Sequence, residues 1–279
     1  MEKSIQAYIL GNGHMGHLHQ QHLEALGISC TTYDGEEDCY RRILEFFPEE
    51  NEVIFVASPA QSHRSYAFLA LAYGFDVFVE KPIALSMTEV NDLLKIAKQS
   101  HALLFAGHCE RYSLAFQNFL KKFQETAAKI APRKIEFTRW NKPTPRGQDV
   151  SVIWDLGVHD FDLLYTMKQA VPSWDSEKTE IYFDESREAE ESKREIKATF
   201  QVDDVDFVLT CNLNETQPME SDAITREIQE FLRISALPDS ERFEAMNSQL
   251  AGAIFAVQEA EKLNDSAGYN HYSSPNKPK

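Results

Sequence analysis

Lys81, within Glu80-Lys81-Pro82, is the first residue of this sequence whose type and position point to chemistry. It follows the run Asp76-Val77-Phe78-Val79, which is typical of a buried strand. In an open parallel sheet, ligands bind outside the carboxyl ends of the strands, so a lysine at a strand end can lie beside a bound ligand. Lys81 is therefore a candidate catalytic residue, and a solvated strand end is the alternative interpretation.

A second candidate site lies in Asp155-Leu156-Gly157-Val158-His159-Asp160-Phe161-Asp162. On an α-helix, Asp155 and His159 are four residues apart and share a face, so the carboxylate can orient or support the imidazole. Such a pair can act as a general base and its helper, and a capping or surface pair is the more common arrangement at this spacing. No further ligands follow at a suitable spacing, so we expect no metal site.

The glycine-rich segment Gly11-Asn12-Gly13-His14-Met15-Gly16 follows an apolar strand pattern and opens a helical one. In such a fingerprint Gly11 permits a tight turn, Gly13 lets a pyrophosphate approach the backbone, and Gly16 lets helix and strand pack closely. The segment, including His14 and Met15, is therefore a predicted dinucleotide-binding turn.

Asp34 stands 18 residues after Gly16, at the end of the expected second strand. A carboxylate there accepts hydrogen bonds from ribose hydroxyls and repels a 2′-phosphate, which favours NAD over NADP. The alternative is a simple turn residue before Gly35.

Strand and helix patterns alternate over the first part of the chain, which predicts a doubly wound parallel sheet. The expected strands are 4–10, 29–33, 53–57, 76–80 and 102–106, and the expected helices are 17–26, 38–47, 62–73 and 88–99, the last capped by Thr88. The predicted class is α/β, with a nucleotide-binding domain over residues 1–116.

The second part predicts an α+β domain, residues 117–263, with a reduced and mostly antiparallel sheet. Its expected strands are 133–140, 180–183, 195–202 and 205–212, with 180–183 antiparallel like the others and a hairpin turn at Asp203-Asp204. A helix is expected from Val152, and two more at 221–234 and 240–263. The polar tail, residues 264–279, is expected to be disordered.

Composition limits the possible partners of this 279-residue chain. Its net charge of −16 argues against nucleic-acid binding, which needs clustered Lys and Arg. No apolar run approaches a membrane span or a signal peptide, so we expect a cytoplasmic protein. The four cysteines form no Cys-x-x-Cys pair and are expected to be reduced thiols.

Five motifs in order resemble the Gfo/Idh/MocA family of NAD(P)-dependent oxidoreductases. They are Gly11-x-Gly13-x-x-Gly16-x-x-His19, Ser58-Pro59-x-x-x-His63, Glu80-Lys81-Pro82, Gly107-His108-x-Glu110-Arg111-Tyr112 and Asp155-x-Gly157-x-His159-x-x-Asp162. The resemblance covers 5–164 strongly and 222–263 weakly. It implies a dehydrogenase in which hydride passes from a carbinol carbon to nicotinamide.

The resemblance also implies roles for individual residues. His159 would be the base, Lys81 would bind or relay the proton of the reacting oxygen, and Asp155 would orient the substrate or His159. Ser58, Pro59, His63, Glu80, Lys81 and Pro82 would line the cofactor site, with a cis peptide before Pro82. The substrate would meet Lys81, Glu110, Arg111, Tyr112, Arg146, Asp155 and His159, although Arg111 and Arg146 equally suit pairing with a neighbouring carboxylate.

Within the family, residues 107–112 and 146–156 are most similar to bacterial UDP-N-acetylglucosamine 3-dehydrogenases. The implied substrate is a nucleotide sugar; a free sugar or inositol, or a non-catalytic NAD-binding regulator, are the alternatives. The second domain departs from the pattern, since only about ten residues, 213–222, separate the last strand from the next helix. A sheet that is one or two strands short leaves both the substrate and a possible homo-oligomer open.

Overall fold

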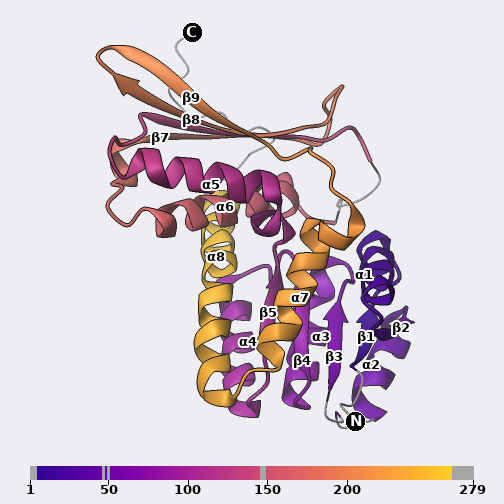
Figure 1. Cartoon of the computed structure of the whole chain (residues 1–279). Helices are drawn as coiled ribbons and strands as arrows, with labels where there is room; N and C mark the ends of the chain where they lie inside the picture. The colour runs from indigo at the N-terminus through magenta and orange to yellow at the C-terminus, as the bar shows by residue number, and fades with distance from the viewer. Residues whose placement is uncertain (1–4, 46–47, 49–50, 145–148, 266–279) are drawn as a thin grey trace.

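The computed structural model describes residues 5–45, 48, 51–144 and 149–265. These residues form two sheets, with the first in the lower part of Figure 1 and the second across its top.

The first sheet is fully parallel, with the strand order β2-β1-β3-β4-β5. Its strands are β1 (Gln6–Leu10), β2 (Ser29–Tyr33), β3 (Glu52–Val56), β4 (Asp76–Glu80) and β5 (Leu104–Gly107). β3, β4 and β5 are nearly continuous apolar runs because helices cover both of their faces. The predicted doubly wound sheet is confirmed, and its order reverses between β1 and β3, where such folds bind ligands.

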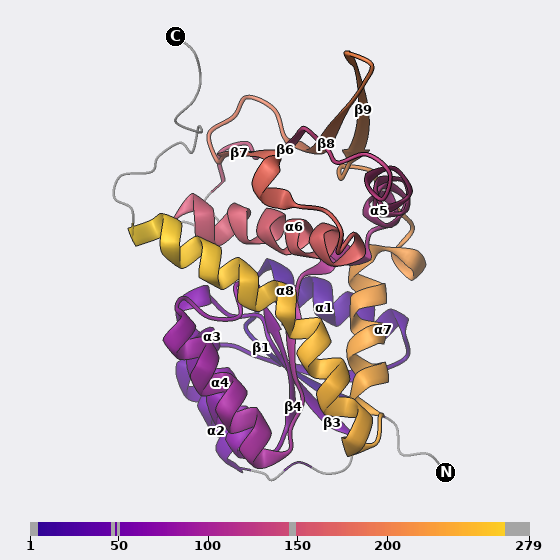
Figure 2. The ribbon, with the colours of Figure 1, turned by 90° about the vertical axis from the view of Figure 1, so that its left-hand side faces the viewer.

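Four helices connect these strands. They are α1 (His14–Ala25), α2 (Glu36–Glu45), α3 (Ala60–Ala72) and α4 (Met87–Ser100). The expected cap of α4 is wrong: Ser86, not Thr88, is the N-cap, and its hydroxyl accepts the N–H of Glu89 at 3.2 Å. Figure 2 shows α2, α3 and α4 on one face of the sheet and α1 on the other.

The two C-terminal helices, α7 (Ala223–Ser235) and α8 (Asp239–Asp265), complete that other face (Figure 2). The ring of Phe231 on α7 lies 5.3 Å from that of Phe55 and 5.5 Å from that of Phe105. Residues of α7 and α8, which lie within the predicted second domain (117–263), therefore belong to the core of the first sheet. Helix α8 extends to Asp265, so the expected tail begins inside it, and residues 266–279 lie outside the described part.

The second sheet has the order β7-β6-β8-β9. Its strands are β6 (Lys134–Trp140), β7 (Glu180–Ser186), β8 (Lys193–Val202) and β9 (Val205–Asn212). The expected antiparallel pairing of 180–183 is wrong: β7 is parallel to β6, because helix α6 (Val158–Ala170) carries the chain back between them. The other pairs are antiparallel, and positive φ at Asp203 and Asp204 confirms the hairpin turn.

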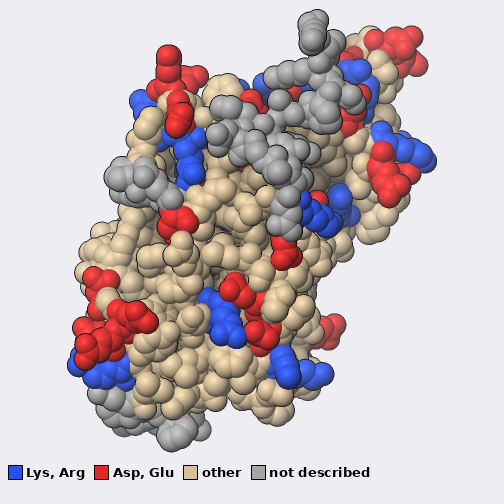
Figure 3. Space-filling model, turned by 180° about the vertical axis from the view of Figure 1, so that it is seen from behind, with Lys and Arg blue, Asp and Glu red and all other residues tan. Residues whose placement is uncertain are grey.

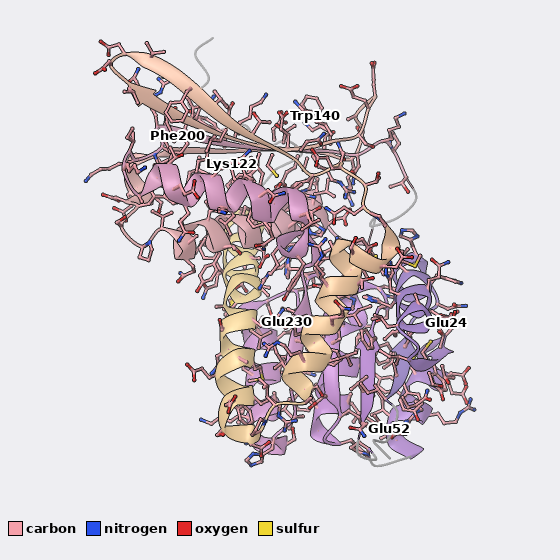
Figure 4. The ribbon with its side chains drawn as sticks, in the orientation of Figure 1. Glu24, Glu52, Lys122, Trp140, Phe200 and Glu230 are labelled. Carbon is pink, nitrogen blue, oxygen red and sulfur yellow. The ribbon has the colours of Figure 1, made fainter. Side chains whose placement is uncertain are left out.

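Helices α5 (Leu114–Ala127) and α6 pack on this sheet. The ring centroid of Phe123 on α5 lies 6.0 Å from that of Phe200 on β8. Figure 4 places Phe200 in the sheet layer and Glu52, the first residue of β3, at the far end of the molecule. The parallel strands therefore run toward the second sheet. Their carboxyl ends, and whatever binds there, meet the second domain.

Acidic and basic side chains lie next to one another over the face shown in Figure 3. Among the described helices, none is both long and apolar enough to cross a membrane.

Candidate active site

A cleft of about 1400 Å³ lies at the carboxyl ends of the first sheet. One wall comes from the loops after β1 to β5, and the other from residues within 139–144, 149–159 and 192–224. The predicted site residues that line it are Gly11, Gly13, His14, Met15, Asp34, Ser58, Pro59, His63, Glu80, Lys81, Pro82, Glu110, Asp155 and His159. Gly16, Arg111 and Tyr112 are not among its lining residues, and Arg146 lies outside the described part of the chain.

The glycine fingerprint forms the turn between β1 and α1, as its spacing predicts. Gly11 has φ +115°, and a side chain there would meet the carbonyl oxygen of Ala57 at 2.6 Å. A side chain at Gly16 would meet the carbonyl oxygen of Gly11 at 2.0 Å, so this glycine lets α1 start against the strand. A side chain at Gly13 would meet no described atom within 4 Å, because this position faces the cleft.

Asp34 directly follows the last residue of β2, next to this turn, and lies on the cleft wall. Its Oδ1 lies 3.4 Å from the backbone nitrogen of Asn12. The carboxylate and the helix N-terminus thus border the same space, which fits the ribose and pyrophosphate of a dinucleotide.

Glu80 and His63 support the loop around Lys81. The Glu80 carboxylate is 2.7 Å from His19 Nε2. Burial raises the pKa of Glu80, but the hydrogen bond and charge of His19 outweigh that and lower it. The His63 ring lies 2.8 Å from the carbonyls of both Pro82 and Ser58, and burial lowers its pKa, so the neutral ring donates to one of them. The expected cis peptide between Lys81 and Pro82 is confirmed.

Lys81 reaches from the end of β4 to the second domain. Its Nζ donates to the carbonyl oxygen of Asp155 at 2.7 Å and to Asp155 Oδ1 at 3.0 Å. About a fifth of each side chain is exposed, at 19% and 20%. The two candidates from sequence-distant motifs therefore form one ion pair in the cleft.

His159 lies two residues beyond the π-helical turn η2 (Ile153–Gly157), which leads into α6. In a π-turn the backbone bonds run from i to i+5, so η2 is wider than the α-helix expected here. Asp155 pairs with Lys81, and Nδ1 of His159 is buried without a hydrogen-bond partner among the described residues. Burial, followed by the charges of Lys81 and Arg139, holds the pKa of His159 well below 6.5.

Glu110 lies at the cleft and holds a buried arginine. Arg139 is 1% exposed, and its guanidinium donates to Glu110 Oε1 at 2.7 Å and to Asp160 Oδ1 at 3.1 Å. Burial raises the pKa of Glu110, but the charge of Arg139 outweighs this and lowers it. Glu110 is therefore an ionised group that joins η1 (Cys109–Tyr112), β6 and α6.

Of the two roles expected for Arg111, substrate contact or pairing with a carboxylate, the structure has the pairing. Its guanidinium forms an ion pair with Asp162 and donates to the carbonyl of Gln249 at 2.8 Å. The neighbouring Tyr112 accepts a bond from Arg226 at its carbonyl, at 2.6 Å.

Arg139 and Arg194 are cleft residues that sequence reasoning missed. A usable signal was present for Arg139. In the alternating pattern of β6 it follows the buried Ile135 and Phe137 on the same face, where a charged residue needs partners. Arg194 is its register partner on β8 and gave no comparable signal.

Residues 9–108 match the family described as "Oxidoreductase family, NAD-binding Rossmann fold", Gfo/Idh/MocA. A UDP-N-acetylglucosamine 3-dehydrogenase of Acidithiobacillus ferrooxidans is 28% identical over 175 residues, 59% of this chain and 54% of that protein. The chain thus matches about half the length of such a relative.

Solved structures show the likeness of the fold over nearly the whole chain. The 3-dehydrogenase GnnA from Acidithiobacillus ferrooxidans superposes with a TM-score of 0.69 at 20% identity, covering 95% of this chain and 98% of that one. An inositol dehydrogenase homologue from Azotobacter vinelandii, complexed with NADH and myo-inositol, gives 0.71 at 12% identity, covering 98% and 97%. Residues 9–108 thus match the NAD-binding Rossmann domain of the Gfo/Idh/MocA oxidoreductases, and the chain as a whole has the fold of these solved structures.

Proposed function

We propose that the protein is an NAD-dependent dehydrogenase that oxidises a hydroxyl of a nucleotide sugar, the 3-hydroxyl of UDP-N-acetylglucosamine. The observation that carries this proposal is the meeting of Lys81, Asp155 and His159 in the cleft that the glycine fingerprint borders. A regulator that only binds a dinucleotide needs none of these three side chains.

The residues of the first wall fit NAD. Gly13 leaves open space where pyrophosphate would approach, and backbone N–H groups at the start of α1 can bind it. The Asp34 carboxylate can accept hydrogen bonds from the two ribose hydroxyls and would repel a 2′-phosphate. NAD is therefore the preferred cofactor over NADP.

Asp155 and His159 of the second wall, together with Lys81 of the first, act on the substrate hydroxyl. NAD, when bound, supplies the nicotinamide that accepts hydride from the carbinol carbon. His159 is neutral and takes the hydroxyl proton as the carbon–oxygen double bond forms. The Lys81 ammonium stabilises the negative charge that develops on the oxygen, and Asp155 holds Lys81 in place.

The substrate class rests on the relative and on the cleft. Pockets for one small ligand have volumes of roughly 300–1,000 Å³. This cleft is larger, so it can hold both a cofactor and a substrate that is itself as large as a nucleotide sugar. Lys142 and Arg194 line it and can meet a diphosphate. The 28% identical relative is named for the same nucleotide sugar.

The test is NADH formation with NAD and UDP-N-acetylglucosamine, with free sugars, myo-inositol and NADP in parallel. We expect turnover with the nucleotide sugar and a loss of about a hundredfold or more in kcat for Lys81→Met and His159→Asn. Turnover with myo-inositol but not with the nucleotide sugar would make inositol the substrate in place of UDP-N-acetylglucosamine. Tight NAD binding without reduction by any sugar would favour the regulator.

A further inference from the structure

Glu185 on β7 is a buried carboxyl group that the proposed mechanism does not use. It is 4% exposed, and its Oε1 has no hydrogen-bond partner among the described residues. Phe183, two residues earlier on the same face of the strand, packs against Phe161 of α6 at 4.9 Å between ring centroids. Glu185 therefore occupies a position of the sheet that faces α6 and would ordinarily be apolar.

The carboxyl group of Glu185 lies against Gly157. A side chain on Gly157 would meet both Glu185 carboxylate oxygens at 2.9 Å, closer than packed side chains approach. Gly157 is the last residue of the π-helical turn η2. Asp155 precedes it by two residues and His159 follows it by two, so the packing at Gly157 bears on both of them.

The charges around Glu185 are already balanced. Arg139, its register partner on β6, and Arg194 on β8 carry two positive charges, and Glu110 and Asp160 carry two negative ones. Burial and then the charge of Asp160 raise the pKa of Glu185 well above its usual value, although Arg139 opposes this. Burial therefore favours the neutral form of Glu185, and its contact with Gly157 is one of shape.

We propose that Glu185 is a positioning residue whose carboxyl group fills the space beside Gly157 and holds the η2 turn, so that Asp155 stays against Lys81 and His159 stays in the cleft. Its effect on turnover rests on the proposed function. Its effect on the geometry of the turn does not, because that can be measured without a substrate.

The test compares Glu185→Asp, Glu185→Gln, Gly157→Ala and the double variant Gly157→Ala/Glu185→Ala. Imidazole ¹⁵N spectra of His159, identified with His159→Asn, report the turn, and NADH affinity reports the cofactor wall. We expect the shorter side chain of Glu185→Asp and the added methyl of Gly157→Ala each to move the His159 signals. Each should lower kcat by about ten- to a hundredfold at unchanged NADH affinity, because small misplacements of catalytic groups cost that much.

Glu185→Gln keeps the shape and should match the wild type in spectra and kcat. The double variant removes the clash, so it should recover at least about tenfold of the kcat lost in Gly157→Ala. Asp184→Ala is the matched control, because Asp184 is the exposed neighbour on the opposite face of β7.

Unchanged His159 signals in Glu185→Asp, or a double variant that recovers none of the kcat lost in Gly157→Ala, would overturn the proposal. An impaired Glu185→Gln would overturn it as well. If the wild type reduces no NAD with any sugar, the proposed function fails while the spectra still decide the role of Glu185.

Discussion

His159 is neutral in the folded protein, and this determines how activity should respond to acid. Burial and the cationic groups that face it, Lys81, Arg139 and Arg194, lower its pKa well below 6.5, with His108 adding to the effect. A lowered pKa means that the base form survives to lower pH. We therefore expect the acid limb of kcat/KM to lie below pH 6.5. A pH–rate profile checks this, and a limb at or above that value would belong to another group.

Asp34 should decide the choice of cofactor. Replacing it with Ala removes the acceptor for the ribose hydroxyls and the repulsion of a 2′-phosphate, while its exposed position keeps the fold intact. We expect weaker NADH binding and a reduced preference over NADPH, measured as the two Kd values by fluorescence. An unchanged ratio of the two would show that Asp34 is only a turn residue.

Sequence reasoning identified Lys81, Asp155 and His159, and the structure brings all three to one cleft. It could not assign ion-pair partners. Arg111 binds Asp162, which is 51 residues away, and Asp155 binds Lys81 at a separation of 74. Which carboxylate meets which cation depends on tertiary packing, and spacing along the chain carries no information on it.

At the level of elements, substitutions at Gly16 and Gly13, two glycines of one turn, should have different effects on stability. Gly16→Ala places a methyl group on the backbone of Gly11, so the helix must shift. We expect a loss of about 1–3 kcal/mol in the free energy of unfolding, measured by urea denaturation. Gly13→Ala meets no described atom and should unfold like the wild type.

The same pair should separate folding from cofactor binding. The methyl group of Gly13→Ala enters the space that pyrophosphate would occupy, so NADH affinity should fall while stability holds. Equal destabilisation by the two substitutions would contradict the different roles of these positions.

Local signals predicted elements well where each strand or helix had a single pattern. The parallel sheet followed from apolar strands alternating with helices, and the Asp203-Asp204 turn from its residue types. The direction of β7 did not follow, because a strand that pairs in parallel or antiparallel can have the same alternation. The η2 turn also had no signal, since π-helical backbone has no sequence pattern of its own.

At the scale of the whole molecule, Arg111 joins three parts of the chain. From η1 it reaches Asp162 on α6 and the backbone of α8. Asp162 is 1% exposed, so Arg111→Met would leave a buried carboxylate without its partner. We expect a loss of about 3–5 kcal/mol in the free energy of unfolding, measured by urea denaturation, and a smaller loss for Arg111→Lys. Unchanged stability with a raised substrate KM would instead make Arg111 a substrate contact.

The two walls of the cleft come from different stretches of chain, the first from the loops of one sheet and the second largely from the other domain. Different residues therefore determine the choice of cofactor and the choice of substrate. The two walls are connected mainly where Lys81 contacts Asp155. Substitutions in the second wall can therefore change the sugar substrate during evolution while the dinucleotide cofactor stays the same. A chimera that exchanges residues 114–222 between relatives, and keeps α7 and α8 with the first sheet, should keep one parent's dinucleotide and acquire the other's substrate.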